Sequence, residues 1–547
     1  MSIEYFVEGK VSSQTEGDQL AFSKGHIVHN GSSNVLQKGS DTGVSYNKSN
    51  EVHSNDKPVK TIDVSLNLFF DGTLNNKTNT EQGFSKEKKS GSYANDYSNV
   101  ARGYDAIDAT AENQVSWYIE GIGTVDGKTD NDTLGLPVRG AGLGVAERGI
   151  KAKVTKGCLK GAEAIKNRFG SKEIDVLSVN VYGFSRGAAA ARHFVQVSTT
   201  APKTSKKLGG GLAVYPPDFY ELSKAEEKQN EKTNEQILNI AKDKTDSYLL
   251  KFGYFGACLV SNNLKIKKVK FNFVGLYDTV ASYGANHRGN WFVKNDSEQL
   301  GLNAVQNADF IFQIASADEF RDNFSLTNIE GSGIKGLQFT LPGVHSDIGG
   351  GYVDGEQENV LIYKATNDKK SCEKYRNILI EEGWYDPAQI SIVTKTYPSR
   401  FSVIYKYELW GKRNLSNHFD KLPLHYMFHF SDFFGVKYLD NQRKKNQITD
   451  GTVKTISSHL QPYIEKCVQL RNSFITNIKA GQQASASDYI STSRGYSYLN
   501  FSMNLNDLKD LRKGYLHWSA NLDAFGMGPI VSGVHPLSER KRTILDG

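Results

Sequence analysis

Four apolar, strand-like runs separated by long crossovers restrict the folds open to this chain. They are DVSLNLFF (63–70), IDVLSVNVY (174–182), KVKFNFVGLY (268–277) and KGLQFTLPGV (335–344). Runs rich in Val, Ile, Leu and Phe are typical of strands buried on both faces, and parallel neighbours need long crossovers between them. We therefore expect an α/β fold with a mainly parallel sheet flanked by helices.

Composition divides the chain into three parts. Residues 1–60 are rich in Ser, Asn, Gly, Lys and His without a sustained period, which predicts an extension or docking arm. The strand and crossover pattern covers 61–355, interrupted at about 202–268 by a glycine-rich stretch and the charged run LSKAEEKQNEKTNEQ, where we expect an insertion with a solvated helix. Residues 356–547 predict a second, more helical module, with helix candidates at 371–382, 422–438 and 457–478.

Charge and cysteine usage exclude several classes of protein. Lys and Arg total 66 against 60 Asp and Glu, and a surplus of +6 spread over 547 residues does not indicate a nucleic-acid partner. Contact with an anionic lipid surface remains open. The four cysteines are far apart and form no Cys-x-x-Cys or Cys/His pattern, so we expect no zinc site, no disulfide framework and no cofactor.

The amino-terminal stretch MSIEYFVEGKVSSQTEGDQ lacks the positive start and apolar core of a signal peptide. No later apolar run approaches the roughly 18 residues that a membrane-spanning helix needs. We expect a protein made in the cytoplasm whose export, if any, uses a route without a cleaved signal.

The stretch GFSRG (183–187) predicts a nucleophile elbow at Ser185. Such an elbow needs a strand, a turn so sharp that small residues stand two before and two after the serine, and then a helix, as in α/β hydrolases. Gly183 and Gly187 occupy those two positions, and AAAA (188–191) begins a helix. The Arg186 amide would then lie at the helix amino terminus, where it can hold an oxyanion.

A serine nucleophile needs an acid and a base, and Asp278 is the acid candidate. It follows the apolar strand KVKFNFVGLY directly, at the carboxyl end where parallel sheets place their sites. A helix-capping aspartate is the alternative interpretation, and Asp347 is the next acid to consider.

His345 is the base candidate. It ends the stretch LPGVH and is followed by three glycines, Gly349, Gly350 and Gly351, that permit close backbone approach. A histidine there can reach Ser185 with one ring nitrogen and Asp278 with the other. The competing candidates, each equally able to be a packed or capping imidazole, are His425, His517 and His535.

Two glycine-containing stretches resemble nucleotide or phosphate sites but fail a specific test. FFDGTL (69–74) is similar to the D-x-D-G-T loop of haloacid dehalogenase-type phosphatases, yet Phe69 stands where the nucleophilic aspartate belongs. Its Gly72 and Thr73 amides instead offer donors for an oxyanion hole. GAGLG (140–144) follows Pro137 rather than a strand, so it is not a dinucleotide fingerprint.

The aromatic stretch LPLHYMFHFSDFF (422–434) places Met427, Phe430 and Phe434 on one helical face. A helix facing the core is the simpler interpretation. Exposure of this face would instead favour contact with a membrane.

Six stretches occur in this order: LFFDGTLNN, YIEGIGT, NVYGFSRGAAAAR, VGLYDTVAS, ADEFRDNF and LPGVHSDIGGGY. Together they resemble the Tle1 family of type VI secretion lipase effectors, which has an α/β-hydrolase domain. The resemblance covers about 61–355. GYLHWSA and RKRTILDG are also similar to the carboxyl end of these effectors. The insertion after the nucleophile helix and the extension before Thr61 depart from the family, so lid and docking functions do not transfer.

The resemblance implies a phospholipase A that is injected into a rival bacterium and hydrolyses membrane phospholipids in its periplasm. It also implies carriage by a VgrG spike and a cognate immunity protein that protects the producer. The family's nucleophile, acid and base fall on Ser185, Asp278 and His345.

Two other functions stay open at this point. One is a soluble carboxylesterase or acylhydrolase that acts on small or peptidoglycan-linked esters. The other is a secretion-associated binding module without turnover, in which Ser185 is a turn residue. The presence of serine, aspartate and histidine together favours an enzyme.

Overall fold

The computed structural model describes ten segments of the chain: 61–85, 90–130, 148–219, 236–281, 300–398, 403–482, 484–501, 503–524, 527–530 and 539–547. The expectations for 1–60, for the glycines at 140–144, for most of the charged run before residue 237 and for His535 lie outside these segments.

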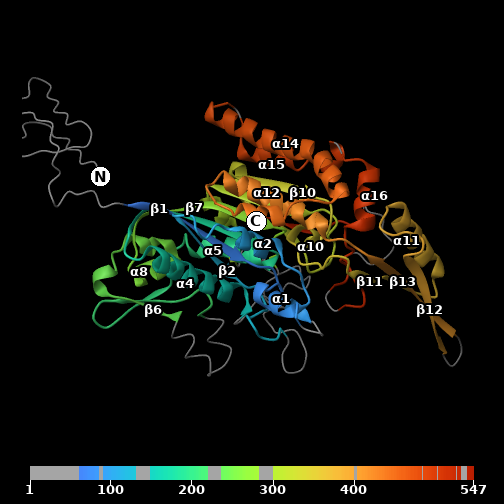
Figure 1. Cartoon of the computed structure of the whole chain (residues 1–547), viewed down its shortest axis with the longest axis horizontal. Helices are drawn as coiled ribbons and strands as arrows, with labels where there is room; N and C mark the ends of the chain where they lie inside the picture. Colours follow the sequence, from blue (N-terminus) through green and yellow to red (C-terminus); the bar gives the residue numbers. More distant parts are fainter. Residues whose placement is uncertain are drawn as a thin grey trace, which may run out of the picture. The chain divides into compact units, whose positions relative to one another are not determined.

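Six parallel strands form the central sheet of the described chain (Figure 1). In spatial order they are β10 (Gly336–Leu341), β8 (Phe310–Ser316), β7 (Lys265–Tyr277), β3 (Glu173–Phe184), β1 (Ile62–Phe70) and β2 (Gln114–Ile119). Every neighbouring pair is parallel. The predicted α/β fold is confirmed, and β2 and β8 join the four strands that the sequence pattern indicated.

Helices cover both faces of the sheet, as Figure 1 shows. On one face lie α4 (Ile150–Phe169), α5 (Arg186–Val197) and α8 (Gly253–Ser261); on the other lie α2 (Asn99–Ala106), α12 (Lys421–Asp432) and α14 (Gly451–Lys479). Side chains along a strand point alternately to the two faces. Leu66, Leu68 and Phe70 of β1 therefore enter one hydrophobic cluster, whereas Phe69 enters the other.

The region expected as an insertion contributes to the main core. It holds a small antiparallel sheet of β4 (Thr204–Lys206), β5 (Leu212–Val214) and β6 (Leu238–Ile240), the short helices η5 (Lys242–Lys244) and η6 (Tyr248–Phe252), and α8. The apolar sequence GYFGACLVS explains why α8 is buried, because it presents no polar face. Part of 202–268 is thus structural rather than appended.

The region after β10 combines helices with a second sheet. Strands β11 (Gln357–Thr366), β13 (Val403–Asn414) and β12 (Ile390–Pro398) form an antiparallel sheet, and α11 (Lys369–Glu381), α12 and α14 are the three predicted helices. Helix α12 ends at Asp432 rather than at 438, because Gly435 adopts a φ of 82° and turns the chain.

The remaining short elements connect these parts. They are α1 (Lys77–Gly83), η2 (Gly91–Tyr93), η7 (Leu302–Asn307), β9 (Leu326–Thr327), η8 (Glu330–Lys335), α10 (His345–Gly349), η9 (His418–Asp420), α13 (Asp440–Lys445), α15 (Ala486–Ser493), η10 (Tyr498–Asn500), α16 (Leu505–Gly514) and β14 (Ile544–Leu545).

The boundary expected at residue 355 does not separate compact units. Residues 61–547 form a single unit. One hydrophobic cluster joins Phe69, Tyr182 and Phe310 of the central sheet to Leu422 and Leu460 of the later helices. The helical region therefore completes the core of the sheet instead of standing beside it.

The face of α12 that we considered for membrane contact points into this core. Met427 and Phe430 are buried, and the Phe434 ring stacks on Phe310 with centroids 5.1 Å apart. The core-facing interpretation is correct, and membrane contact through this face is not supported. Phe433, on the opposite side, is 73% exposed.

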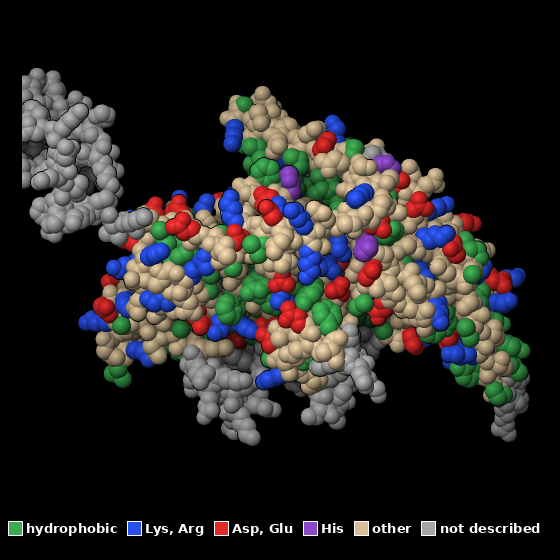
Figure 2. Space-filling model, viewed as in Figure 1, with side chains coloured by type: hydrophobic (Ala, Val, Ile, Leu, Met, Phe, Trp, Pro, Cys, Tyr) green, Lys and Arg blue, Asp and Glu red, His purple; other side chains and the backbone are tan. Residues whose placement is uncertain are grey.

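Exposed apolar side chains gather on the hairpin of β12 and β13. Val393, Tyr397, Val403 and Tyr405 are all exposed there, and Figure 2 shows hydrophobic side chains at this end of the molecule. Elsewhere on the same face, basic and acidic side chains are interspersed. Among the described residues, no helix has both the length and the apolar composition that crossing a bilayer requires.

A row of buried asparagines crosses the middle of the sheet. Asn180 on β3 donates from Nδ2 to Asn67 Oδ1 on β1 at 2.9 Å, and Asn272 on β7 donates from Nδ2 to Asn180 Oδ1 at 3.1 Å. Buried amides cost free energy unless they are paired, so these bonds favour one register of the three central strands. That register also sets where the strands end.

Candidate active site

The predicted site residues lie at the carboxyl edge of the sheet. Strand β1 is flanked by β2 on one side and by β3 on the other. The chain passes from β1 to β2 and then crosses back to β3, which creates a switch point between β1 and β3. Ligands of open parallel sheets bind outside the carboxyl ends at such a point. Ser185 follows β3, Asp278 follows β7, and His345 begins α10 shortly after β10.

Ser185 forms a strained turn between β3 and α5. Its φ of 59° and ψ of −128° lie in a region that favours glycine, and such a conformation costs about 1–3 kcal/mol. The Ser185 amide donates to Tyr277 O at 3.0 Å, and Ser185 O accepts from the Ala188 amide at 3.0 Å. These bonds fix the serine between the end of β7 and the first turn of α5.

The glycines on either side of Ser185 leave no room for a side chain. A Cβ on Gly187 would overlap the carbonyl oxygens of Phe70 and Asp71, and a Cβ on Gly183 would overlap the backbone of Gly187 and Ala188. Both neighbours are backbone atoms, which cannot rotate away. The close approach of strand and helix that the sequence pattern predicted is present.

Asp278 and His345 form a buried hydrogen-bonded pair. His345 Nδ1 lies 2.6 Å from Asp278 Oδ2, and both side chains are almost fully shielded from solvent. Asp278 occupies a position with a φ of 47° and accepts two further bonds from Ser316, from its amide at 2.8 Å and from its hydroxyl at 3.0 Å. It begins no helix, so the capping interpretation does not apply.

An arginine also contacts the carboxylate of Asp278. Arg542 Nη1 donates to Asp278 Oδ1 at 2.6 Å. Burial by itself would raise the pKa of Asp278, but Arg542 and His345 outweigh burial and hold the pKa well below its ordinary value. Asp278 is therefore ionised at any pH near neutrality.

His345 sits in an aromatic setting with one free ring nitrogen. Its ring centroid lies 4.7 Å from that of Phe184 and 5.0 Å from that of Phe324. Nε2 is buried and has no hydrogen-bond partner among the described residues. Burial lowers the pKa of His345, although the bond to Asp278 opposes this shift, so the imidazole is neutral and Nε2 is available as a proton acceptor.

The groups expected to form an oxyanion hole lie next to the elbow. Thr73 Oγ1 accepts from Arg186 Nε at 2.8 Å, which ties the β1 loop to the start of α5. The Gly72 amide already donates to Asp71 Oδ1 at 2.7 Å, so it serves an oxyanion only if it leaves that carboxylate. The Thr73 amide makes no hydrogen bond within the described part of the chain.

Asp71 is a buried carboxylate that sequence reasoning did not select. It accepts from Tyr118 Oη at 2.5 Å and from Ser98 Oγ at 2.6 Å, besides the Gly72 amide. Burial raises the pKa of Asp71 to about 6 despite these three donors. Asp71 therefore ties the start of the loop that carries Gly72 and Thr73 to Ser98 and to Tyr118 of β2.

The alternative acid and bases have other partners. His517 Nδ1 lies 2.7 Å from Asp347 Oδ1, and its ring stacks on Tyr352. His425 Nε2 lies 2.8 Å from Asn446 O. These two histidines are packed imidazoles, and Asp347 belongs to His517 rather than to His345.

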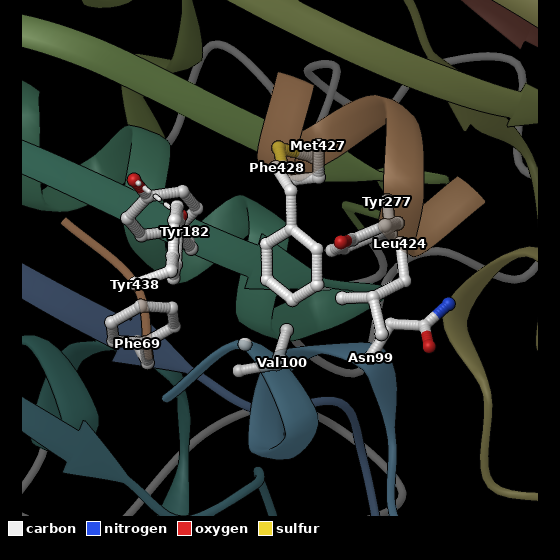
Figure 3. Close-up of a pocket in the computed structure, with 10 residues that line it drawn as sticks. Phe69, Asn99, Val100, Tyr182, Tyr277, Leu424, Met427, Phe428 and Tyr438 are labelled. Atoms are coloured by element: carbon white, nitrogen blue, oxygen red, sulfur yellow. Dashed lines mark hydrogen bonds between the residues drawn. The ribbon is translucent and has the colours of Figure 1, made fainter. Parts of the chain in front are cut away.

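A small cavity lies close to the same sheet edge but is not the site. It is lined by Phe69, Asn99, Val100, Gly103, Tyr182, Tyr277, Leu424, Met427, Phe428 and Tyr438 (Figure 3). It has room for about one water molecule. The Tyr277 hydroxyl there is buried without a hydrogen-bond partner in the described structure. Neither Ser185 nor His345 reaches it.

The described residues contain no group of three His, Cys, Asp or Glu side chains arranged to hold a metal ion. All four cysteines are buried free thiols. Burial raises the pKa of the Cys158 and Cys258 thiols, which leaves them unreactive at neutral pH.

A comparison with protein families identifies the family of this chain. A family model described as "T6SS, Phospholipase effector Tle1-like, catalytic domain" matches residues 65–370, more than half of the chain. The chain belongs to this family. The Tle1 resemblance seen in the sequence motifs is thereby confirmed, and the chain is a Tle1-like type VI secretion phospholipase effector.

One solved structure supports the Tle1-like fold. The structure of the Tle1 effector bound to the VgrG spike of the type VI secretion system is 19% identical, with a TM-score of 0.51, and covers 93% of this chain and 99% of that chain. An uncharacterized protein from Pseudomonas aeruginosa is 16% identical over 76% of this chain and 53% of that chain, with a TM-score of 0.34. No curated protein matches.

Three residues around the candidate site were not indicated by the sequence: Arg542, Ser316 and Asp71. Arg542 and Asp278 are 264 positions apart in the chain, and no local pattern links them. RKRTILDG contains Arg542 and is similar to the end of Tle1 effectors, which is the single signal that the sequence offered. Ser316 and Asp71 each follow or end a buried strand, as Asp278 does.

Proposed function

We propose that this effector is a serine hydrolase of the phospholipase A type, which cleaves acyl esters of membrane glycerophospholipids. Ser185 is the nucleophile, His345 the general base and Asp278 the acid. The observation that carries the proposal is the buried Asp278–His345 pair, whose free Nε2 lies at the same sheet edge as the strained Ser185.

In the first half of the reaction, Ser185 Oγ attacks the acyl carbon of the ester. The hydroxyl proton moves to His345 Nε2, and Asp278 stabilises the imidazolium through Nδ1. The tetrahedral oxyanion lies at the amino end of α5, where the Arg186 amide and the Thr73 amide serve as its donors. Collapse transfers the proton from His345 to the leaving glyceryl oxygen and releases a lysophospholipid.

In the second half, water hydrolyses the acyl-enzyme. His345 Nε2 takes a proton from water, the resulting hydroxide attacks the acyl carbon, and the same proton returns to Ser185 Oγ as the fatty acid leaves. None of these reaction steps uses a cofactor or a metal ion. The neutral state of His345 permits both proton transfers at neutral pH.

The experiment that tests the proposal incubates purified protein with vesicles of phosphatidylethanolamine and phosphatidylglycerol. Mass analysis of the products identifies fatty acid and lysophospholipid. The acyl chain that is released from the lipid distinguishes cleavage of the sn-1 ester from cleavage of the sn-2 ester. We expect Ser185→Ala to remain folded and to lose hydrolysis by several powers of ten. Ser458→Ala, at an exposed serine of α14, is the matched control and keeps the wild-type rate.

Three outcomes would contradict the proposal. Wild-type turnover in Ser185→Ala would remove Ser185 from the mechanism. Hydrolysis of short soluble esters without any hydrolysis of vesicles would indicate a soluble esterase. Failure of a fluorophosphonate probe to label Ser185 would favour a binding module without turnover.

We further propose that a VgrG spike carries this effector into the periplasm of a rival cell and that an immunity protein protects the producer. Support comes from the family and from the similar Tle1 structure, which is bound to VgrG. Residues 1–60 and the exposed surface of 61–547 are both candidates for the spike contact. Co-purification of the full chain with its VgrG protein tests this delivery route.

A further inference from the structure

The carboxylate of Asp278 is surrounded by more donors than its bond to a histidine requires. Oδ1 accepts from the Ser316 amide and from Arg542 Nη1, while Oδ2 accepts from the Ser316 hydroxyl and faces His345 Nδ1. One of these donors, Arg542, carries a full positive charge. The acid of the proposed mechanism, Asp278, is therefore one half of an ion pair with Arg542, whose positive charge balances the carboxylate.

Arg542 is held in place by several bonds of its own segment. Its Nε donates to Phe324 O at 2.6 Å and its Nη1 also donates to Ser316 Oγ at 3.0 Å. Directly after it, β14 pairs with β9 in parallel, and the Leu326 amide donates to Thr543 O at 2.9 Å. The 542–545 segment is thus fixed against the loop that carries Phe324.

That loop is in turn attached to the acid. The Thr327 amide of β9 donates to Thr279 O at 2.9 Å, and Thr279 is the residue after Asp278. The Arg542 side chain is 6% exposed, so water does little to screen its charge from Asp278. A distant part of the chain therefore supplies a fixed cation to this carboxylate.

We propose that Arg542 is a positioning residue, which neutralises and orients Asp278 so that His345 stays unprotonated and ready to accept the serine proton. The proposal rests on the roles given above to Ser185, Asp278 and His345. An imidazole beside a bare buried carboxylate binds a proton tightly, because the imidazolium is stabilised by the opposite charge. A cation on the far side of the carboxylate reduces that stabilisation.

Other charged groups around His345 are already paired with one another. Glu319 accepts from Arg321 Nε at 2.9 Å, and its second oxygen is 3.3 Å from the His345 amide. Asp347, on the same short helix as His345, is bonded to His517. Asp318 accepts from Arg512 at 3.3 Å. Arg321 also lowers the pKa of His345 and interacts with Asp278, but two side-chain bonds hold it on Glu319, so removal of Arg542 leaves the direct contact with Asp278 unreplaced.

The test measures the protonation of His345 directly and through the reaction. Histidine labelled with ¹³C at Cε1 is titrated by NMR in wild type, Arg542→Gln, Arg542→Met and Arg542→Lys, with the His345 signal assigned by its loss in His345→Gln. In parallel, kcat/KM for a soluble butyrate ester is measured from pH 5 to 9. Thermal melting of each variant establishes that it is folded.

We expect Arg542→Gln and Arg542→Met to raise the pKa of His345 by about one unit or more. The acidic limb of the kcat/KM profile should shift to higher pH by the same amount. At a given pH on that limb kcat/KM then falls roughly tenfold, while the plateau changes little. Arg542→Lys keeps the cation and should stay near wild type. A merely structural role would instead lower kcat/KM evenly at every pH.

Arg540→Gln is the matched control. It removes another buried cation of the same segment, one that pairs with Glu382 and does not contact Asp278. It should reduce thermal stability and leave the pKa of His345 unchanged. An unchanged pKa in folded Arg542→Gln, an equal shift in Arg540→Gln, or loss of folding in both neutral Arg542 variants would overturn the proposal. Because NMR reads His345 without substrate, these outcomes remain distinct from a failure of the wild type to hydrolyse esters.

Discussion

Backbone strain at a single residue marks the candidate nucleophile. Ser185 and Asp278 are two of the few described residues other than glycine with a positive φ, and both belong to the site. Aspartate tolerates the left-handed region, whereas serine at φ 59° and ψ −128° does so at a cost. The strain is maintained because Ser185 bonds both the end of β7 and the first turn of α5.

This strain predicts that two substitutions of Ser185 differ in their effect on the free energy of unfolding. Ser185→Ala keeps the strain, while Ser185→Gly removes it and gains more freedom in the unfolded chain, a partial offset of about 0.5–1 kcal/mol. We expect Ser185→Gly to have a free energy of unfolding about 1 kcal/mol higher than Ser185→Ala. Urea unfolding of both variants measures the difference. A glycine variant that is less stable than the alanine variant would show that the turn is unstrained.

At the scale of elements, the site depends on how closely α5 approaches β1 and β3. Gly183 and Gly187 let backbone meet backbone, and Gly349 of α10 leaves room for the Phe184 ring, which itself packs on His345. The strand ends therefore approach α5 backbone to backbone, while the Phe184 ring fills the space between β3 and α10. The asparagine row in the sheet keeps β1, β3 and β7 in register with that arrangement.

Gly187→Ala tests this close approach. Its methyl group would overlap the carbonyl oxygens of Phe70 and Asp71, so α5 and β1 must separate. We expect a loss of about 3 kcal/mol or more in the free energy of unfolding, together with loss of ester hydrolysis. Gly451→Ala, at a helical glycine of α14 with open space around it, should change stability by less than about 0.5 kcal/mol. Equal, small effects at the two positions would contradict the packing described here.

At the scale of the whole molecule, the region after residue 355 is part of the hydrolase core. The face of the sheet that carries Phe69, Tyr182 and Phe310 is covered by helices α12 and α14. A buried ion pair between Arg102 on α2 and Asp420 before α12, at 2.6 Å, links the same regions. Arg542 adds a third connection, from the far end of the chain to the candidate site.

A fragment of residues 61–355 should therefore not fold by itself. It would expose one apolar face of the central sheet to water, and each square ångström of apolar surface left uncovered forfeits about 25 cal/mol. We expect the fragment to be insoluble or to lack a cooperative thermal transition by circular dichroism, whereas the full chain melts cooperatively. A soluble, cooperatively folding fragment with esterase activity would show that the later helices form an independent domain.

Local sequence was sufficient for the features that depend on near neighbours. Apolar runs such as 174–182 and 268–277 became β3 and β7, because a strand buried on both faces must be apolar throughout. The G-x-S-x-G spacing placed Ser185 at an elbow, since a turn that sharp requires small residues at fixed positions. The strand ends also placed Asp278 and His345 at one edge of the sheet.

Features that join distant residues required the folded chain. The hydrogen bond between Asp278 and His345, the stacking of Phe434 on Phe310 and the contact of Arg542 with the acid follow from packing between segments more than sixty residues apart. Such contacts leave no period or spacing in the sequence, because their energy comes from surfaces and charges that meet only after the sheet and its helices have assembled.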